Sequence, residues 1–285
     1  MKRRMKKLSA LLLVCALTAM SIAGCGSSGK DSAKSSGSEG GHFTGDESVE
    51  EIVKAAAAEG KVGNWGGGSE YEVEALLAKY GQDTTFLNQA YDMDGFDDDS
   101  IMLASAMTYN ELGLVKNDYE GGYGYGDDIG IIDFNKEGVA MLEDNLFCTK
   151  EFAEKNPNTV KAFISASMKG WKYACENPEE AAEIVYKYGS SVSPEHQAYM
   201  AEEVKKLVET DTEGNTVTDY GQMVDSAMQQ TLDITKKYIT LDDASANDAL
   251  QDITLDDIRD VSYWTDAMAG NWGELEKTRS EEHRS

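Results

Sequence analysis

The pattern of apolar residues changes near residue 149, and this change limits the folds open to the chain. Before that point, short apolar runs alternate with segments whose apolar residues recur at helical spacing; after it, nearly every segment has helical spacing. Pro157, Pro178 and Pro194 each fall near the start of one of the later segments, where a helix tolerates proline. Strand-like runs that alternate with helical segments, followed by helical segments alone, predict an α/β lobe over 46–150 and a helical part over 151–264.

Turn signals divide these two parts into individual elements. The predicted strands cover 61–65, 84–90, 101–106 and 129–134, with one more within 139–149. The predicted helices cover 47–59, 69–80, 108–117, 149–155, 157–176, 178–188, 193–208, 219–238 and 246–260. Gly60 and Gly81 are expected to end the first two helices, because glycine readily adopts the left-handed conformation that follows a last turn. Residues 265–285 are expected to form a polar tail.

The N-terminus has the pattern of an export signal. Basic residues precede an apolar run from Leu8 to Met20, and small residues then lead to Cys25. This arrangement predicts a signal peptide over 1–24, and the apolar run is short for a membrane-spanning helix. The Ile-Ala-Gly-Cys sequence resembles a bacterial lipobox, which implies that Cys25 is lipidated; the alternative is an ordinary signal peptide with an incidental cysteine. Residues 25–45 would then be a flexible Gly/Ser-rich tether.

Charge and cysteine content restrict the partners and the redox chemistry. The formal net charge is −26, which repels nucleic acid and anionic lipid and makes both poor partners. Only Cys148 and Cys175 belong to the predicted folded part, and no C-x-x-C motif is present. We expect two buried free thiols, although an exported protein permits a disulfide between them.

The glycine-rich stretch after the first predicted strand lacks the residues of a phosphate-binding loop. Gly63 and Gly68 have the spacing of a P-loop, but Ser69-Glu70 follows where Lys-Ser/Thr is required. A dinucleotide fingerprint fails as well, since Tyr71 replaces its last glycine. Three glutamates in the next helix add negative charge where a phosphate would lie. The sequence therefore argues against a phosphate or nucleotide ligand.

The same stretch can hold another kind of ligand. Ser69 and Glu72 match the S-x-x-E capping box, which would start a helix just after the glycines. Gly66, Gly67 and Gly68 would let a ligand approach the backbone closely, and Trp65 offers a flat surface for stacking. The structural alternative is a tight strand-to-helix turn with a buried tryptophan.

A second stretch, Met107 to Glu111, also follows a predicted strand and precedes a helix. Thr108 and Glu111 match a capping box again. Loops that leave the carboxyl ends of parallel strands share one crevice, in which ligands bind. Both loops should therefore face one space bordered by Trp65, Tyr71 and Tyr109, which suits a small, flat, polar ligand.

Other candidate sites fail on composition or spacing. The acidic segment 92–100 resembles a calcium loop, but its glycine is misplaced and Leu103 stands where a glutamate is needed. The histidines at 42, 196 and 283 are scattered, so we predict no metal site and no catalytic triad. Trp171 and Tyr173 are expected to lie in the core. We expect no cofactor and no catalytic residue.

Four stretches within 60–260 carry a family resemblance: GKVGNWGGGSEYEVEALLAKYG, ASAMTYNE, EGVAMLEDNLFCT and KNPNTVKAFISASMKGWKYACENPEEAAEIVYKYG. They resemble the substrate-binding lipoproteins of bacterial ABC importers, in the branch related to thiamine-pyrimidine-precursor binding proteins and akin to sulfonate, taurine and nitrate binders. The resemblance implies a periplasmic-binding-protein type II-like lobe that passes a small molecule to a permease and its ATPase. It also implies a non-enzymatic protein at the outer face of the cytoplasmic membrane.

The resemblance places the ligand against the two loops described above. The implied ligand-binding residues are Asn64, Trp65, Gly66, Gly67, Gly68, Glu70, Tyr71, Met107, Thr108, Tyr109, Asn110 and Glu111. Trp65 would stack on a pyrimidine ring and Asn110 would bond to its edge. Either Glu70 or Glu111 would meet an amino group.

The sequence departs from the family before the first of these loops. Family members carry most of a first lobe there, whereas this chain has only residues 42–60. The first lobe is either largely deleted or replaced by 47–61. This leaves three alternatives to a pyrimidine binder: a sulfonate, taurine or nitrate binder, a truncated copy that binds nothing, or a relative of the fungal pyrimidine synthases. The last would need a cysteine-rich motif, which is absent from the sequence.

Overall fold

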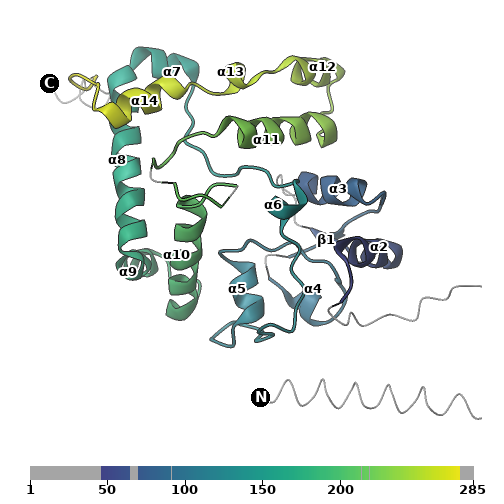
Figure 1. Ribbon diagram of the computed structural model, residues 1–285. Helices are drawn as coiled ribbons and strands as arrows, with labels where there is room; N and C mark the ends of the chain where they lie inside the picture. Colours follow the sequence, from purple (N-terminus) through teal and green to yellow (C-terminus); the bar gives the residue numbers. More distant parts are fainter. Residues whose placement is uncertain (1–45, 65–69, 91, 213, 218, 277–285) are drawn as a thin grey trace, which may run out of the picture. The chain divides into compact units, whose positions relative to one another are not determined.

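The computed structural model describes residues 46–64, 70–90, 92–212, 214–217 and 219–276 (Figure 1). The predicted signal peptide, the whole tether with Cys25, and the glycine-rich loop 65–69 lie outside these ranges. No helix in the described ranges is both long enough and apolar enough to cross a membrane.

Most of the described chain is helical. The elements before residue 149 are α2 (Val49–Glu59), β1 (Gly63–Asn64), α3 (Glu70–Lys79), β2 (Leu87–Asn88), α4 (Asp94–Asp97), α5 (Glu111–Lys116) and α6 (Phe134–Glu137). Those after it are α7 (Lys150–Lys155), α8 (Pro157–Glu176), α9 (Pro178–Tyr188), α10 (Pro194–Val208), α11 (Asp225–Tyr238), α12 (Ala244–Asp252), α13 (Leu255–Ile258) and α14 (Val261–Ala269). The three prolines occupy the first helical positions predicted for them.

Helix α2 has local signals at both ends. Ser48 and Glu51 form a capping box, in which the serine hydroxyl accepts from the Glu51 N–H and the glutamate accepts from the Ser48 N–H. Gly60 ends the helix with φ 65°, the left-handed conformation predicted for it.

Replacing Ser48 by alanine should lower the free energy of unfolding by about 1 kcal/mol, because the Glu51 N–H then loses its acceptor. Urea denaturation measures this change. Ser190→Ala, at an exposed serine outside every helix of the described chain, is the matched control. An equal loss of unfolding free energy in Ser48→Ala and Ser190→Ala would contradict the role of the cap.

The strands form a small parallel arrangement around residues 61–64. Gly63 pairs with Leu87 and Asn64 with Asn88, and Val62 bridges in parallel to Leu103. The Gly63 N–H donates to the Leu103 carbonyl at 2.8 Å on one side, while the Val62 carbonyl accepts from the Leu87 N–H at 2.8 Å on the other. A Cβ on Gly63 would lie 2.7 Å from the Ile101 side chain, so the close approach requires glycine.

Three strand predictions need correction. The strand predicted over 101–106 is reduced to the bridge at Leu103. Residues 129–134 and 139–149 form no strand; the first range leads into α6, which Asp133 caps, and the second is irregular. Strand formation needs a partner strand for the N–H and carbonyl groups, and neither segment pairs with a strand of the described chain. The α/β alternation predicted for 46–150 is therefore short, and the described protein is mostly helical.

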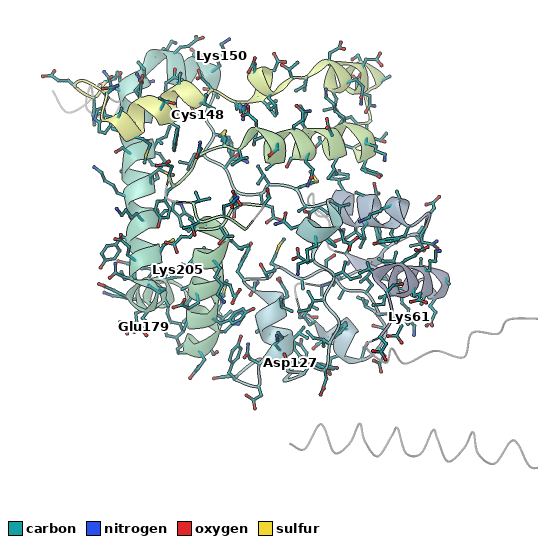
Figure 2. The ribbon with its side chains drawn as sticks, viewed as in Figure 1. Lys61, Asp127, Cys148, Lys150, Glu179 and Lys205 are labelled. Carbon is teal, nitrogen blue, oxygen red and sulfur yellow. The ribbon has the colours of Figure 1, made fainter. Side chains whose placement is uncertain are left out.

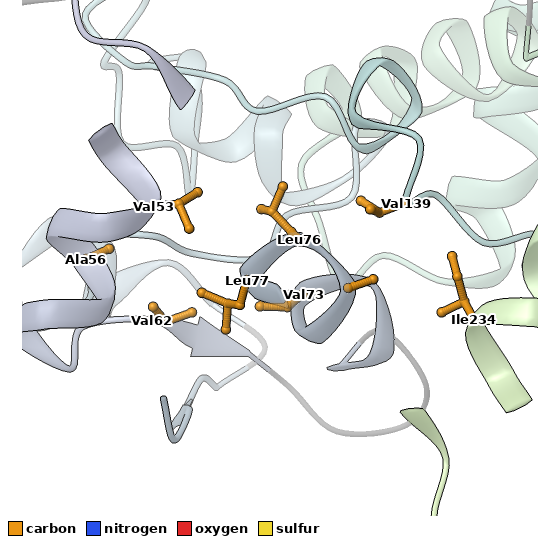
Figure 3. Close-up of a cluster of buried hydrophobic side chains, with 9 residues drawn as sticks. Val53, Ala56, Val62, Val73, Leu76, Leu77, Val139 and Ile234 are labelled. Atoms are coloured by element: carbon orange, nitrogen blue, oxygen red, sulfur yellow. The ribbon is translucent and has the colours of Figure 1, made fainter. Parts of the chain in front are cut away.

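The main core lies between α2, α3 and residue 234 of α11 (Figure 3). Leu76, Val53, Ala56 and Val62 are fully buried there. Since α2 supplies two of these side chains, Val53 and Ala56, this helix is part of the folded core. The full cluster consists of Val53, Ala56, Val62, Val73, Ala75, Leu76, Leu77, Val139 and Ile234.

A second, smaller cluster joins α8 to the loop before α11. Its buried members are Met168, Cys175 and Tyr220. Cys175 is buried and Cys148 is exposed, and both are free, so the disulfide alternative is wrong and only one of the two thiols is buried as expected. Trp171 and Tyr173 are 44% and 47% exposed, so the prediction that they lie in the core is also wrong.

The C-terminal elements differ from the predicted ranges. The helix predicted over 219–238 begins at Asp225, and the helix predicted over 246–260 is divided into α12 and α13. Helix α14 runs past residue 265, where the sequence places the start of a polar tail. The Glu276 carboxylate accepts from the N–H groups of Asn158 and Thr159 at the start of α8.

Candidate functional site

The carboxyl ends of the three parallel segments are joined by a polar network. Asn64, Gln89 and Ser105 each come from a different segment. The Ser105 hydroxyl donates to Asn64 Oδ1 at 2.8 Å, and the Gln89 amide exchanges two hydrogen bonds with the Ser105 backbone, at 2.8 and 3.0 Å. Asn64 and Gln89 are buried. Asn64 and Ser105, the described residues closest to the starts of the two predicted ligand loops, therefore lie side by side.

The first predicted loop is described only at its ends. Trp65, Gly66, Gly67 and Gly68 lie outside the described residues, and so does Ser69, the predicted cap. Glu70 is the first residue of α3 and is half-buried. Tyr71 packs against the main core cluster, and burial together with the neighbouring Glu70 raises its pKa. Tyr71 therefore contributes to packing.

The second loop, Met107 to Glu111, is held by the carboxylate of its last residue. Glu111 is buried; its Oε2 accepts from the Met107 N–H at 2.9 Å and its Oε1 accepts from Asn110 Nδ2 at 2.9 Å. Helix α5 begins at Glu111, so the capping box predicted between Thr108 and Glu111 does not form. The carboxylate is already engaged at Met107, while the Thr108 carbonyl accepts from the Tyr199 hydroxyl at 2.8 Å.

His196, which gave no signal in the sequence, ties this loop to α10. Its side chain is fully buried, with Nε2 2.8 Å from Asn110 Oδ1 and Nδ1 2.5 Å from the Tyr119 hydroxyl. Its ring stacks on that of Tyr199, with centroids 6.0 Å apart. An amide oxygen only accepts, so Nε2 carries the proton and Nδ1 accepts from Tyr119. Burial lowers the pKa of His196, which favours this neutral form.

Carboxylates dominate the electrostatics beside the second loop. Burial, followed by the charges of Glu143, Asp144 and Glu111, raises the pKa of Tyr109. Burial also raises the pKa of Glu143, with further contributions from Asp144 and Glu111. Each charge that raises these two pKa values thus belongs to a carboxylate. Such surroundings attract amines and repel anions.

Glu72 is a further acidic group, and it connects α3 to the chain just before Glu143. Its Oε1 accepts from the Met141 N–H at 2.6 Å, and the side chain is buried. Burial raises its pKa to about 7, and the Glu143 charge adds to the rise. The carboxylate is therefore partly protonated at neutral pH.

Tyr109 also borders an apolar groove of about 210 Å³ among α8, α9 and α10. Trp171 lines this groove together with Met200, and Lys205, labelled in Figure 2, lies on it as well. The exposure of Trp171, which corrects its predicted core position, thus gives the candidate site a second aromatic side chain near Tyr109. Flat apolar rings bind well between such side chains.

Within the described ranges, no group of three or more His, Cys, Asp or Glu side chains is placed to hold a metal ion. The acidic segment 92–100 instead forms α4 and local turns, in which Asp92 Oδ1 accepts from the Asp94 N–H and Asp98 Oδ1 from the Ser100 N–H. These bonds are those of solvated turns rather than of an ion cage.

Comparison with known protein families shows that residues 48–181 match the family model described as NMT1/THI5 like. This is a substrate-binding family of ABC transporters and of thiamine pyrimidine synthesis, and members of it are typically extracytoplasmic. The match includes both candidate loops and begins at α2, and it supports a relationship to substrate-binding proteins of that type. No curated protein and no solved structure matches the chain.

Proposed function

We propose that this protein is an extracytoplasmic substrate-binding lipoprotein of an ABC importer, and that it takes up a thiamine pyrimidine precursor or a similar small heterocycle bearing an amino group. The family match over 48–181 supports the transport role. The observation that carries the ligand class is the carboxylate-rich surroundings of Tyr109, next to the amide of Asn110. The protein binds and releases its ligand without a catalytic step.

The polar groups of the second loop suit an aminopyrimidine edge. Such a ring presents N–H donors and ring-nitrogen acceptors in one plane, and Glu111 and Asn110 offer a carboxylate and an amide side by side. Tyr109 supplies an aromatic face, to which the proposal adds Trp65. Sulfonates and nitrate carry negative charge that Glu143 and Asp144 would repel, which disfavours them even though Lys205 lines the groove beside Tyr109.

The proposal also covers location and partners. Lipidated Cys25 would anchor the protein to the outer face of the bacterial cytoplasmic membrane, and 26–45 would serve as the tether. The partners would be a permease and its cytoplasmic ATPase.

Ligand-induced thermal stabilisation tests the ligand class. Hydroxymethyl- and formylamino-pyrimidines should raise Tm, because a ligand at a hundred times its Kd adds about 2.7 kcal/mol to the stability of the folded form. Taurine, alkanesulfonates and nitrate should leave Tm unchanged. Glu111→Gln should reduce the pyrimidine shift, whereas Glu154→Gln, at an exposed position on α7, should preserve it. Stabilisation by sulfonates alone would sink the pyrimidine assignment, and a two-state melt that no ligand shifts would indicate a non-binding copy.

A further inference from the structure

Four side chains form a continuous hydrogen-bonded series that reaches the second candidate loop from α10. The Tyr119 hydroxyl lies 2.5 Å from His196 Nδ1, and His196 Nε2 lies 2.8 Å from Asn110 Oδ1. Asn110 Nδ2 in turn lies 2.9 Å from Glu111 Oε1. His196 belongs to α10, beyond the residues 48–181 that match the family model, so the match itself assigns this histidine no role.

The direction of the hydrogen bonds in this series is fixed at the Glu111 end. A carboxylate only accepts, so the Asn110 group that meets Oε1 must be its NH2. The other oxygen of the same carboxylate is held in place by the Met107 N–H at 2.9 Å. The amide oxygen of Asn110 therefore faces His196, which must donate from Nε2. If the amide were turned over, its NH2 would meet the Nε2–H donor and its oxygen would meet the Glu111 carboxylate.

The fixed amide determines what Asn110 can offer to a ligand. Its oxygen faces the fully buried His196, whereas Asn110 itself is partly exposed. One Nδ2 hydrogen is donated to Glu111, and the second takes no part in the series. Asn110 can therefore present a donor, which a ligand must meet with an acceptor. An asparagine side chain without the donor at His196 could rotate and present either its oxygen or its NH2.

We infer that His196 is a positioning residue: it holds the Asn110 amide so that the site selects a ring nitrogen that accepts a hydrogen bond over a ring N–H that donates one. This role rests on the pyrimidine site of the proposed function and adds a determinant of its specificity. An aminopyrimidine has an accepting ring nitrogen beside its amino group. When an oxo group replaces the amino group, that ring nitrogen carries hydrogen, and two donors face each other at Asn110.

Two substitutions separate the two hydrogen bonds of the imidazole. A glutamine side chain can place its NH2 where Nε2 lies, so His196→Gln keeps the donor to Asn110 and loses the acceptor for Tyr119. An asparagine side chain is shorter and reaches only the position of Nδ1. His196→Asn therefore keeps an acceptor for Tyr119 and loses the donor to Asn110. Both variants should be less stable than the wild type, but only His196→Asn should lose discrimination between the two pyrimidines.

Calorimetric titration of the full-length chain with a hydroxymethyl-aminopyrimidine and with its oxo analogue measures this discrimination. The wild type and His196→Gln should bind the amino form at least about tenfold more tightly, because two opposed donors leave both groups without a partner. In His196→Asn the ratio should fall to about threefold or less. Tyr80→Phe controls for lost stability alone. It removes a hydroxyl that donates to Glu137 Oε2 at 2.7 Å, just after α3, and should keep the wild-type ratio.

Each result bears on a different step. Equal ratios in His196→Gln and His196→Asn would overturn the positioning role, because a residue that only stabilises the fold affects both ligands alike. A wild type that prefers the oxo form would overturn the direction assigned to the amide. A wild type that binds neither form would overturn the proposed function, and the role of His196 with it. Nitrogen NMR of the imidazole checks the direction without ligand: we expect the proton on Nε2, and a proton on Nδ1 alone would contradict it.

Discussion

Replacing His196 by leucine should lower the free energy of unfolding by about 2–4 kcal/mol. The fully buried imidazole donates to Asn110 and accepts from Tyr119, so its removal leaves an amide oxygen and a hydroxyl without their partner. Each unsatisfied buried group costs about 1–3 kcal/mol. The loss should be measured by urea denaturation at pH 7.5. Amide hydrogen exchange at Leu112 and Gly113 should accelerate as well, because their N–H groups bond to the carbonyls of Met107 and Asn110 in the loop that His196 holds.

Tyr199→Phe provides the control for this network. It removes the hydroxyl that donates to the Thr108 carbonyl but keeps the ring that stacks on His196, so the cost should be only about 1 kcal/mol. A second comparison uses Tyr119→Phe. Combining it with His196→Leu should cost less than the sum of the two single changes, because the pair no longer leaves a hydroxyl unsatisfied. The network would not hold the loop if the stability losses of Tyr119→Phe and His196→Leu were strictly additive in the double variant. The same would follow if His196→Leu lost less stability than Tyr199→Phe.

The same histidine should make stability fall in mild acid. Burial lowers the pKa of His196 in the folded protein, so the unfolded chain binds a proton more readily. Stability is therefore retained above the unfolded pKa, about 6.5, and is lost as the pH falls below it. Protonation at Nδ1 would also break the bond that Tyr119 donates. The difference between wild type and His196→Leu should narrow as the pH falls below 6.5.

Local signals in the sequence predicted the features that depend on neighbouring residues. The proline starts of α8, α9 and α10 and the glycine end of α2 follow from backbone geometry within one turn. The order of strand and helix in 61–111 also predicted the parallel pairing that brings Asn64 and Ser105 together, whereas the position of the loop at 65–69 stays a prediction. These predictions needed no knowledge of distant contacts.

Features that depend on distant residues could not be predicted in this way. His196 bonds to a residue 86 positions away, and Glu72 bonds to one 69 positions away. Neither pair can be recognised from the sequence. His196 and Glu72 each fit the helix that contains them, so no break in periodicity and no motif marks the distant partner. The strand predicted over 129–134 failed for a related reason, because an apolar run becomes a strand only where a neighbouring edge is open. Trp171 was assigned to the core from its apolar character, although a helix can turn such a side chain toward a groove.

Helix α2 was left open by the sequence and is placed by the structure. From the sequence alone, 47–61 could either replace a first lobe or follow its deletion. The family match begins at residue 48 and so includes α2. Val53 and Ala56 are fully buried in the cluster formed with α3 and Val62, so α2 covers a core surface that would otherwise face solvent. The lobe that carries the candidate loops therefore has a closed core on that side, which is a physical condition for the proposed ligand site to exist at all.

Glu72→Gln should raise stability at alkaline pH by about 2 kcal/mol and have little effect near pH 4.5. Burial raises the folded pKa of Glu72 to about 7, so the folded protein holds a proton that the unfolded chain releases at lower pH. The associated stability is complete below the unfolded pKa, 4.5, and is lost as the pH rises through the folded pKa. Glutamine is neutral throughout, and its oxygen can still accept from the Met141 N–H.

Urea denaturation of both proteins from pH 4.5 to 8.5 measures the difference, and Glu154→Gln, at an exposed position, is the matched control. A stability difference that does not grow between pH 4.5 and 8 would contradict the raised pKa. The direction is opposite to that of His196, whose contribution is lost on the acid side. The two contributions therefore oppose each other in mild acid: as the pH falls from about 7 toward 4.5, the protonated Glu72 adds stability, while protonation of His196 removes it below 6.5. In the Glu72→Gln variant only the loss at His196 remains, so the stability of this variant should fall more steeply with acid than that of the wild type.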